Sequence, residues 1–224
     1  MRTKIGRILE WLCASERRML AFAAGIGFAA ALSGAAVVYA EHAQAEIADG
    51  VVRLHILANS DGADDQAVKI LVRDALLPEL TELLASADGK ESACAALSAE
   101  LEAIAMAAEA VLRENGYDYG ARAGIARAYF PTREYGDIAL PAGQYDALRI
   151  ELGTGAGKNW WCMVFPPLCY VDIAQTDVTA ETKEALAAVL STDGAALVTG
   201  AGGSKRLRFK LVELWQEWKA NWYK

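Results

Sequence analysis

The segment Asn159-Trp160-Trp161-Cys162-Met163-Val164-Phe165-Pro166-Pro167-Leu168-Cys169 brings two tryptophans, two cysteines and a double proline into eleven residues. Aromatic rings bury a large area with few rotatable bonds, and the two prolines fix the direction of the backbone. The segment therefore predicts a well-ordered structural element, with a strand over Trp160–Phe165 and a turn after it. No acid, base or metal-ligand cluster surrounds it in the sequence, so by itself it indicates structure rather than chemistry.

A second strand is predicted at Val51–Ala58, where apolar residues at positions 52, 54 and 56 alternate with Arg53 and His55. This alternation is typical of a strand with one buried face. The oxygen-bearing side chains of Asn59–Asp61 follow at once, and they can cap the next helix by accepting its free N–H groups.

The remaining elements are predicted from periodicity and from glycine and proline breakers. They are helices over Asp64–Ala85, Glu91–Glu114, Thr179–Leu190 and Leu207–Trp222, and strands over Ala121–Phe130 and Ala147–Leu152. Pro78 is expected to kink or break the first helix, and Asn115-Gly116 to stop the second. The glycine-rich connection Gly153–Gly157 predicts a hairpin between the last two strands. The fold class is therefore α+β, with helices packed on one face of a mostly antiparallel sheet.

The N-terminus predicts a hydrophobic export helix ahead of this domain. Met19–Ala40 carries no charge over 22 residues and is long enough to cross a bilayer core. Five basic and two acidic residues precede it, a net charge of +3, which places residues 41–224 outside the cytoplasm. Small residues near Ala40 suit a signal peptidase, yet the apolar run exceeds the roughly 7–15 residues of a usual signal peptide. Residues 1–40 are thus interpreted as either a removed signal peptide or a retained membrane anchor.

The exported part is expected to be one acidic domain. Residues 41–224 contain 17 Lys and Arg against 27 Asp and Glu, a net charge of −10, and they are numerous enough to bury a core. A surface of this sign repels nucleic-acid phosphates and anionic lipids. The charge therefore argues against a nucleic-acid binder.

Cys162 and Cys169 are candidates for a disulfide, because exported cysteines tend to pair and Pro166-Pro167 can turn the chain between them. A bridge needs Cα atoms about 4.4–6.8 Å apart, so the chain must fold back. Two small buried thiols are the alternative. Cys94 lies in a helical pattern and is interpreted as a core residue.

Three motifs that resemble chemical sites are interpreted as structure. Gly153–Lys158 lacks the glycine spacing of a phosphate loop and is followed by Asn159, where Ser or Thr would hold Mg²⁺. The carboxylates between Asp61 and Asp65 lack the oxygen spacing of an EF-hand. His55 has no metal-ligand spacing around it, so neither a metal nor a cofactor is expected.

Two other function classes stay open from the residues alone. One is an envelope thiol hydrolase that uses Cys162 or Cys169 with His55, because the partners of such a nucleophile are distant in sequence. The other is an adaptor bound to the cell wall or membrane. The aromatic face of Leu207–Trp222 fits either a core helix or a contact surface.

Two blocks of the chain resemble the stage II sporulation protein R family. They are Val52–Asp61 with Asp65–Lys69 and Val72–Asp74, and Tyr145–Ile150 with Gly153–Cys169. A weaker likeness continues at Phe209–Trp215. The resemblance covers roughly residues 50–172 and consists of long, unusual strings, so it is specific.

The resemblance implies a function that composition does not show. Family members are exported signals of endospore-forming bacteria, secreted from the forespore into the space between the two membranes that separate it from the mother cell. There they activate a membrane-embedded aspartic protease, which removes the pro-sequence of an early mother-cell sigma factor. The resemblance thus implies a signalling protein rather than an enzyme, with that protease as its partner.

Contact with the protease is assigned, as a hypothesis, to polar residues at the corner where the first strand meets the first helix. They are Arg53, His55, Asn59, Asp61, Lys69 and Arg73. Polar groups so close together could bind a loop of a partner. The alternative is that they cap and brace the corner.

Overall fold

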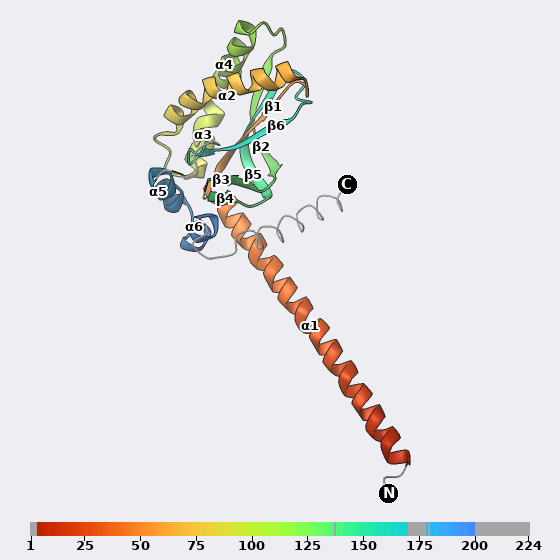
Figure 1. The fold of residues 1–224 in the computed structure, drawn as a ribbon. Coiled ribbons are helices and arrows are strands. Elements are labelled where there is room, and N and C mark those ends of the chain that lie inside the picture. The colour runs from red at the N-terminus through yellow and green to blue at the C-terminus, as the bar shows by residue number, and fades with distance from the viewer. Residues whose placement is uncertain (1–3, 137, 170–177, 179, 200–224) are drawn as a thin grey trace. The chain divides into compact units, whose positions relative to one another are not determined.

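The computed structural model describes residues 4–136, 138–169, 178 and 180–199 (Figure 1). The chain divides into two compact units, Met1–His42 and Ala43–Lys224. The helix predicted at Leu207–Trp222 and the capping residue Thr179 lie outside the described residues.

The first unit contains most of helix α1 (Lys4–Gly50). Large apolar side chains on it, such as Met19, Phe22 and Phe28, are exposed. The sequence predicts a bilayer-crossing segment at Met19–Ala40, but no helix within the described part of the chain is both long enough and apolar enough to span a membrane.

A four-stranded sheet organises the second unit. Its order is β2 (Ala121–Phe130), β5 (Gly143–Leu152), β1 (Val52–Leu57) and β6 (Asn159–Phe165). β1 pairs in parallel with β5, whereas the β1–β6 and β2–β5 ladders are antiparallel. The prediction of an α+β fold with a mostly antiparallel sheet is confirmed.

The hairpin predicted from Gly153–Gly157 is wrong, because β1 lies between β5 and β6. The residues of β1 are all buried, so this apolar strand gains most from a central place with neighbours on both edges. The glycine-rich loop therefore carries the chain across the end of β1 instead of joining two paired strands.

Three helices cover one face of the sheet: α2 (Ala63–Leu84), α3 (Lys90–Ala99) and α4 (Leu101–Glu114). They pack on the larger of two apolar cores, which contains Leu54, Ile56, Val72, Leu76, Leu80, Leu97, Leu112, Leu148 and Ile150. The burial of these helix residues is what holds the three helices against the strands.

Two helix predictions need correction. Of the kink or break predicted at Pro78, the break is absent, because α2 continues through this residue. Leu76, Leu77 and Leu80 on either side are buried, and their packing offsets the lost backbone hydrogen bond. The second predicted helix is divided at Glu100, which has the non-helical angles φ −110° and ψ 12°. The predicted stop is confirmed, since Gly116 has φ of 84°.

The opposite face of the sheet is also covered. A second apolar core there gathers Ile47, Phe130, Ile138, Leu140, Tyr145, Met163, Leu186 and Val198. It draws on the short strands β3 (Arg133–Tyr135) and β4 (Ile138–Leu140) and on helices α5 (Ala180–Val189) and α6 (Thr192–Thr199). Consequently β1 has two buried faces, and the prediction that Arg53 and His55 lie on an open face is wrong.

Candidate functional site

The polar corner at the end of β1 is built from two segments far apart in the sequence. We use "the corner" for Ala58–Asp65, which leads from β1 into α2, together with Gly153–Lys158, which leads from β5 to β6. The side chains of Lys69 and Tyr119, which bond to these segments, are counted with it. β1 and β5 are parallel, so their carboxyl ends reach the same edge of the sheet and bring the two segments together.

Backbone hydrogen bonds hold the second segment around the first. The Gly157 N–H donates to the carbonyl oxygen of Ala58 at 2.8 Å, and the Ala156 N–H donates to that of Asn59 at 3.3 Å. Thr154 donates its N–H to Asn59 Oδ1 at 3.0 Å and its hydroxyl to the Asn59 carbonyl at 2.8 Å. Asn59 is thus enclosed by the loop that the sequence suggested was a hairpin turn.

Asp65 is the hydrogen-bond acceptor at the centre of the corner. Its Oδ2 accepts from Ser60 Oγ at 2.5 Å and Asn59 Nδ2 at 3.0 Å, and its Oδ1 accepts from the Tyr119 hydroxyl at 2.6 Å. The bonds from Ser60 and Tyr119 lower the pKa of Asp65. Burial and the Asp65 carboxylate raise the pKa of Tyr119. Asp65 is therefore charged and Tyr119 neutral across the physiological range.

Asp61 and Lys69 hold the peptide group of Lys158 from two sides. The Lys158 N–H donates to Asp61 Oδ1 at 2.7 Å, and Lys69 Nζ donates to the Lys158 carbonyl at 2.9 Å and to Gln66 Oε1 at 2.7 Å. Lys69 is buried, and this burial lowers its pKa although Asp61 opposes the shift. Both residues therefore fix the loop to α2.

The capping prediction for Asn59–Asp61 is not met. The N-cap of α2 is Gly62, and no side chain caps it. Ser60 Oγ accepts the N–H of Gly62 at 3.1 Å, while the oxygens of Asn59 and Asp61 accept from the loop. Asp64 and Asp65 lie in the first turn of α2, where negative charge stabilises the positive end of the helix dipole.

His55 is buried under an aromatic ring rather than presented to solvent. It stacks on Trp161 with ring centroids 3.9 Å apart, and its Nε2 lies 2.8 Å from Asn159 Oδ1. Burial lowers the pKa of His55, although the bond to Asn159 opposes the shift. The neutral ring therefore donates its Nε2–H to the amide oxygen of Asn159.

Arg53 is fully buried on the same face of the sheet. Its Nε donates to the Cys162 carbonyl at 2.7 Å, and its guanidinium carbon lies 4.3 Å from the ring centre of Phe130 and 5.0 Å from that of Tyr145. A further nitrogen donates to the Tyr135 hydroxyl at 3.2 Å. Through these contacts Arg53, on β1, links this strand to β6 and β3.

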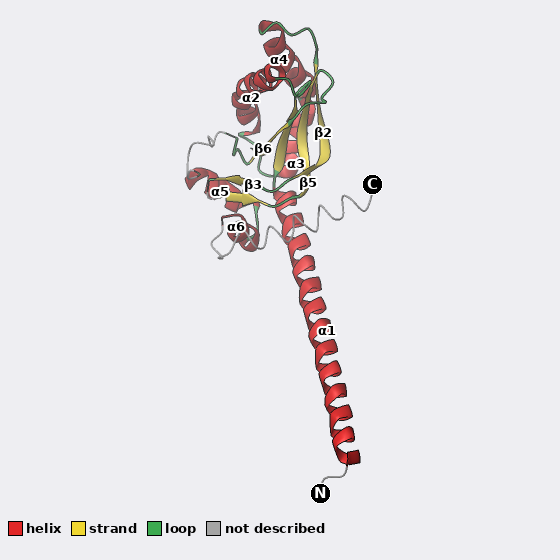
Figure 2. Cartoon of the chain, turned by 45° about the vertical axis from the view of Figure 1, so that its right-hand side comes forward, coloured by secondary structure: helices red, strands yellow, loops and turns green. Residues whose placement is uncertain are grey.

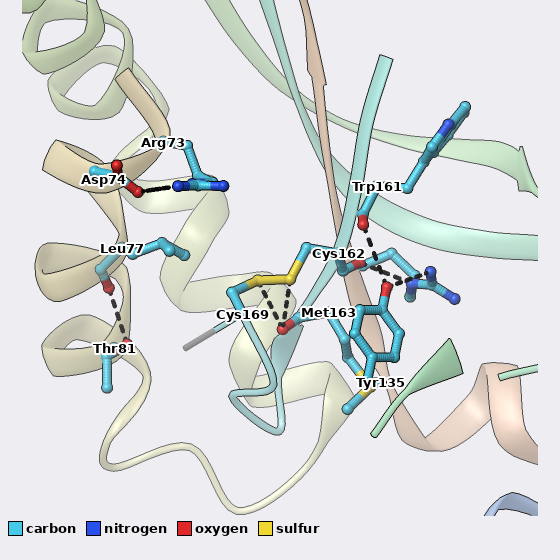
Figure 3. The surroundings of a disulfide bond; sticks show 10 residues. Arg73, Asp74, Leu77, Thr81, Tyr135, Trp161, Cys162, Met163 and Cys169 are labelled. Carbon is cyan, nitrogen blue, oxygen red and sulfur yellow. Dashed lines mark hydrogen bonds and ion pairs between the residues drawn. A yellow bond between two sulfur atoms is a disulfide. The ribbon is translucent and has the colours of Figure 1, made fainter. Parts of the chain in front are cut away.

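Arg73 and the two cysteines complete the set that the sequence singled out. The Arg73 guanidinium lies 4.4 Å from the ring centre of Trp160. It also pairs with the neighbouring Asp74 (Figure 3). Cys162 and Cys169 form a disulfide with Cα atoms 5.6 Å apart (Figure 3). While bridged, neither sulfur is a nucleophile. Cys94 packs against the main core, half-buried.

The structure brings Asn59, Asp61 and Lys69 together in the corner and places the other three candidates outside it. Arg53, His55 and Lys69 are buried, Asn59 and Arg73 are half-buried, and only Asp61 is exposed. Three of the six candidate residues therefore belong to the buried framework of the domain. Asn59, Asp61 and Arg73 are the ones that reach its surface.

Sequence reasoning did not identify Thr154 and Tyr119 as parts of the corner. The position of Asp65, six residues after Asn59 across a tight turn, is a usable signal in the sequence. Thr154 and Tyr119 carry no such signal, because their place depends on the order of the strands.

The fold and the corner define a disulfide-bonded α+β domain that follows an N-terminal helix. The family model described as stage II sporulation protein R matches residues 48–175. The chain is also 35% identical over 170 residues to stage II sporulation protein R of Bacillus subtilis (strain 168), which covers 72% of this chain and 76% of that protein. The chain therefore belongs to the stage II sporulation protein R family, and its role is in sporulation. No solved structure matches it.

Proposed function

We propose that this chain is an exported signal that activates a membrane-embedded aspartic protease, which then processes the precursor of an early mother-cell sigma factor. Residues 1–40 direct the domain across the forespore membrane, as a removed signal peptide or as an anchor, and residues 41–224 act in the intermembrane space. The observation that carries this proposal is the family match over residues 48–175, which contains the corner and the disulfide.

Activation by binding requires that the domain bind the active state of the protease more tightly than its resting state. A surface that is already held in place loses little conformational entropy on binding. The corner has this property, because Asp65, Lys69 and backbone hydrogen bonds fix its loop. In this proposal Asp61 and Asn59 of the corner form the contact rim together with Arg73, which lies on α2 outside the corner.

The buried candidates have a supporting part in the same proposal. Arg53 and His55 hold β1 to β6, and Lys69 holds the loop to α2. Their substitution changes signalling through the shape of the corner rather than through lost contact. The thiol hydrolase is not favoured, because the disulfide occupies both Cys162 and Cys169.

Reconstitution in vegetative cells tests the proposal. This chain, the protease and the sigma-factor precursor are expressed together, and processing of the precursor is followed by gel. Processing is expected with the full chain and not with residues 41–224 retained in the cytoplasm. If all three proteins are present and correctly located and no processing occurs, the proposal is wrong.

The contact rim is tested in the same cells with Asp61→Asn. The amide keeps an oxygen that can accept the Lys158 N–H and removes only the charge, so the fold should be preserved. Processing at limiting expression is expected to fall severalfold. Unchanged processing would remove Asp61 from the contact surface while leaving the signalling role intact.

A further inference from the structure

The two edge strands of the sheet differ in how they are protected against pairing with other chains. β6 carries a register shift opposite Val52 and Arg53 and ends at Pro166-Pro167, which cannot donate to another strand. β2 has neither protection: it pairs with β5 without interruption from Ala121 to Phe130, and contains no proline or lysine (Figure 2). A long, regular edge of this kind is a template for another strand.

The outward-facing backbone groups of β2 can be assigned from one hydrogen bond. The Ala121 N–H donates to Glu109 Oε1 at 3.1 Å, so it points away from β5. Residues of an antiparallel strand alternate between facing their partner and facing away, so Ala123, Ile125 and Arg127 also face away. Among the described residues, no group outside the sheet bonds to these three. The open edge therefore begins just after the position that Glu109 covers.

The charge of β2 indicates what would pair with it. The strand contains Arg122 and Arg127 and no acidic residue, although residues 41–224 carry a net charge of −10. Both arginines are exposed, and they lie on opposite faces because successive side chains alternate. Arg122 forms an ion pair with Glu151, in which its Nη2 lies 3.0 Å from Glu151 Oε2. No ion pair of Arg127 is found among the described residues.

These charges favour a foreign strand over a second copy of this chain. Two copies of β2 paired with each other would bring four arginines into one ladder, and like charges on adjacent strands repel. An acidic strand would instead place a carboxylate beside each arginine. Such carboxylates would be five positions apart and on opposite faces of the added strand.

We propose that β2 is a docking edge for an extended acidic segment of the partner protein, which joins the sheet beside β2 as an additional strand. The inference rests on the proposed function only for the identity of the partner, the membrane protease. Main-chain hydrogen bonds from Ala123, Ile125 and Arg127 supply affinity, and the two arginines select an acidic sequence.

Two pairs of variants of the full chain test the docking edge in the reconstituted cells. Ala123→Pro removes one outward N–H without removing a bond to β5, and Ala123→Ser is its control. Arg127→Gln removes the charge without placing a like charge opposite Asp146, its partner on β5, and Arg127→Lys is its control. Ala123→Pro and Arg127→Gln are each expected to lower processing about tenfold, the effect of losing one to two hydrogen bonds. The controls should stay within about twofold of the unmodified chain.

The outcomes separate this inference from the proposed function. If the unmodified chain gives no processing, the proposed function is wrong. If it gives processing and Arg127→Gln matches Arg127→Lys, the docking edge is wrong, whether or not Ala123→Pro folds.

Hydrogen exchange of the full chain, with and without the protease in lipid nanodiscs, gives an independent result. Slower exchange in peptides of residues 121–130 on binding supports the inference, whereas protection confined to other regions overturns it. A dimer of the chain alone that Ala123→Pro dissociates would assign the edge to a second copy and also overturn the inference.

Discussion

Gly157→Ala should destabilise the domain strongly, because the loop passes too close to the turn after β1 for a side chain. A Cβ at position 157 would overlap the carbonyl carbon and oxygen of Ser60 and lie 3.0 Å from the Cβ of Ala58. The overlapping atoms belong to the backbone, so they cannot move aside as a flexible side chain would. The loop must therefore shift away from the end of β1.

The cost of this shift can be worked from the contacts. Overpacking costs about 1–3 kcal/mol. The displaced loop also loses the bonds from Gly157 to Ala58 and from Ala156 to Asn59, each contributing about 0.5–1.5 kcal/mol. The free energy of unfolding should fall by about 2–6 kcal/mol, a large share of the 5–15 kcal/mol typical of a domain.

Urea unfolding of residues 43–224, followed by circular dichroism, measures this effect. With a slope of about 2 kcal/mol/M, the midpoint should fall by about 1–3 M. Gly124→Ala is the matched control, because a Cβ there meets no atom within 4 Å. The control should change stability by about 0.5 kcal/mol or less. Equal midpoints for the two variants would refute the explanation that the loop at Gly157 passes too close to the Ser60 backbone to admit a side chain.

Two further perturbations follow from the same structure. Replacing Cys162 and Cys169 together by serine should lower the free energy of unfolding by about 2 kcal/mol, because the disulfide closes a loop that restricts the unfolded chain. A reductant should lower the urea midpoint of the wild-type domain by the same amount and leave that of the variant unchanged. The lowered pKa of Asp65 means that the unfolded chain binds more protons just below pH 4, so stability rises with pH there. Asp65→Asn should flatten this part of the stability profile, and an unaltered acid dependence would contradict the role given to Asp65.

The identity of most elements followed from local sequence. β2 occupies the predicted residues 121–130, and β1 and β6 agree with their predictions to within a residue at each end. Periodicity, glycine and proline act over a few neighbouring residues, so they indicate where a strand or helix begins and ends. The candidate disulfide was local as well, since the double proline lies between the two cysteines.

The placement of these elements depended on contacts between distant residues. Pairing of β1 with β5 joins Arg53 to Ala147, and pairing with β6 joins His55 to Trp161; both are about a hundred residues apart in sequence. The short loop at Gly153–Gly157 favoured a hairpin of β5 and β6. However, β1 has two buried faces and is therefore more stable between β5 and β6 than at an edge of the sheet. The placement of β1 between β5 and β6 buried Arg53 and His55 within the domain. It also brought the loop between β5 and β6 around Asn59.

The sequence by itself therefore determined the family, the fold class and the segments that form the corner. Tertiary structure decided which of those polar residues reach solvent and placed β2 at an edge of the four-stranded sheet. The physical reason is that burial and strand order are set by the combined packing of both faces of the sheet, whereas alternation along one strand reports only its own side chains.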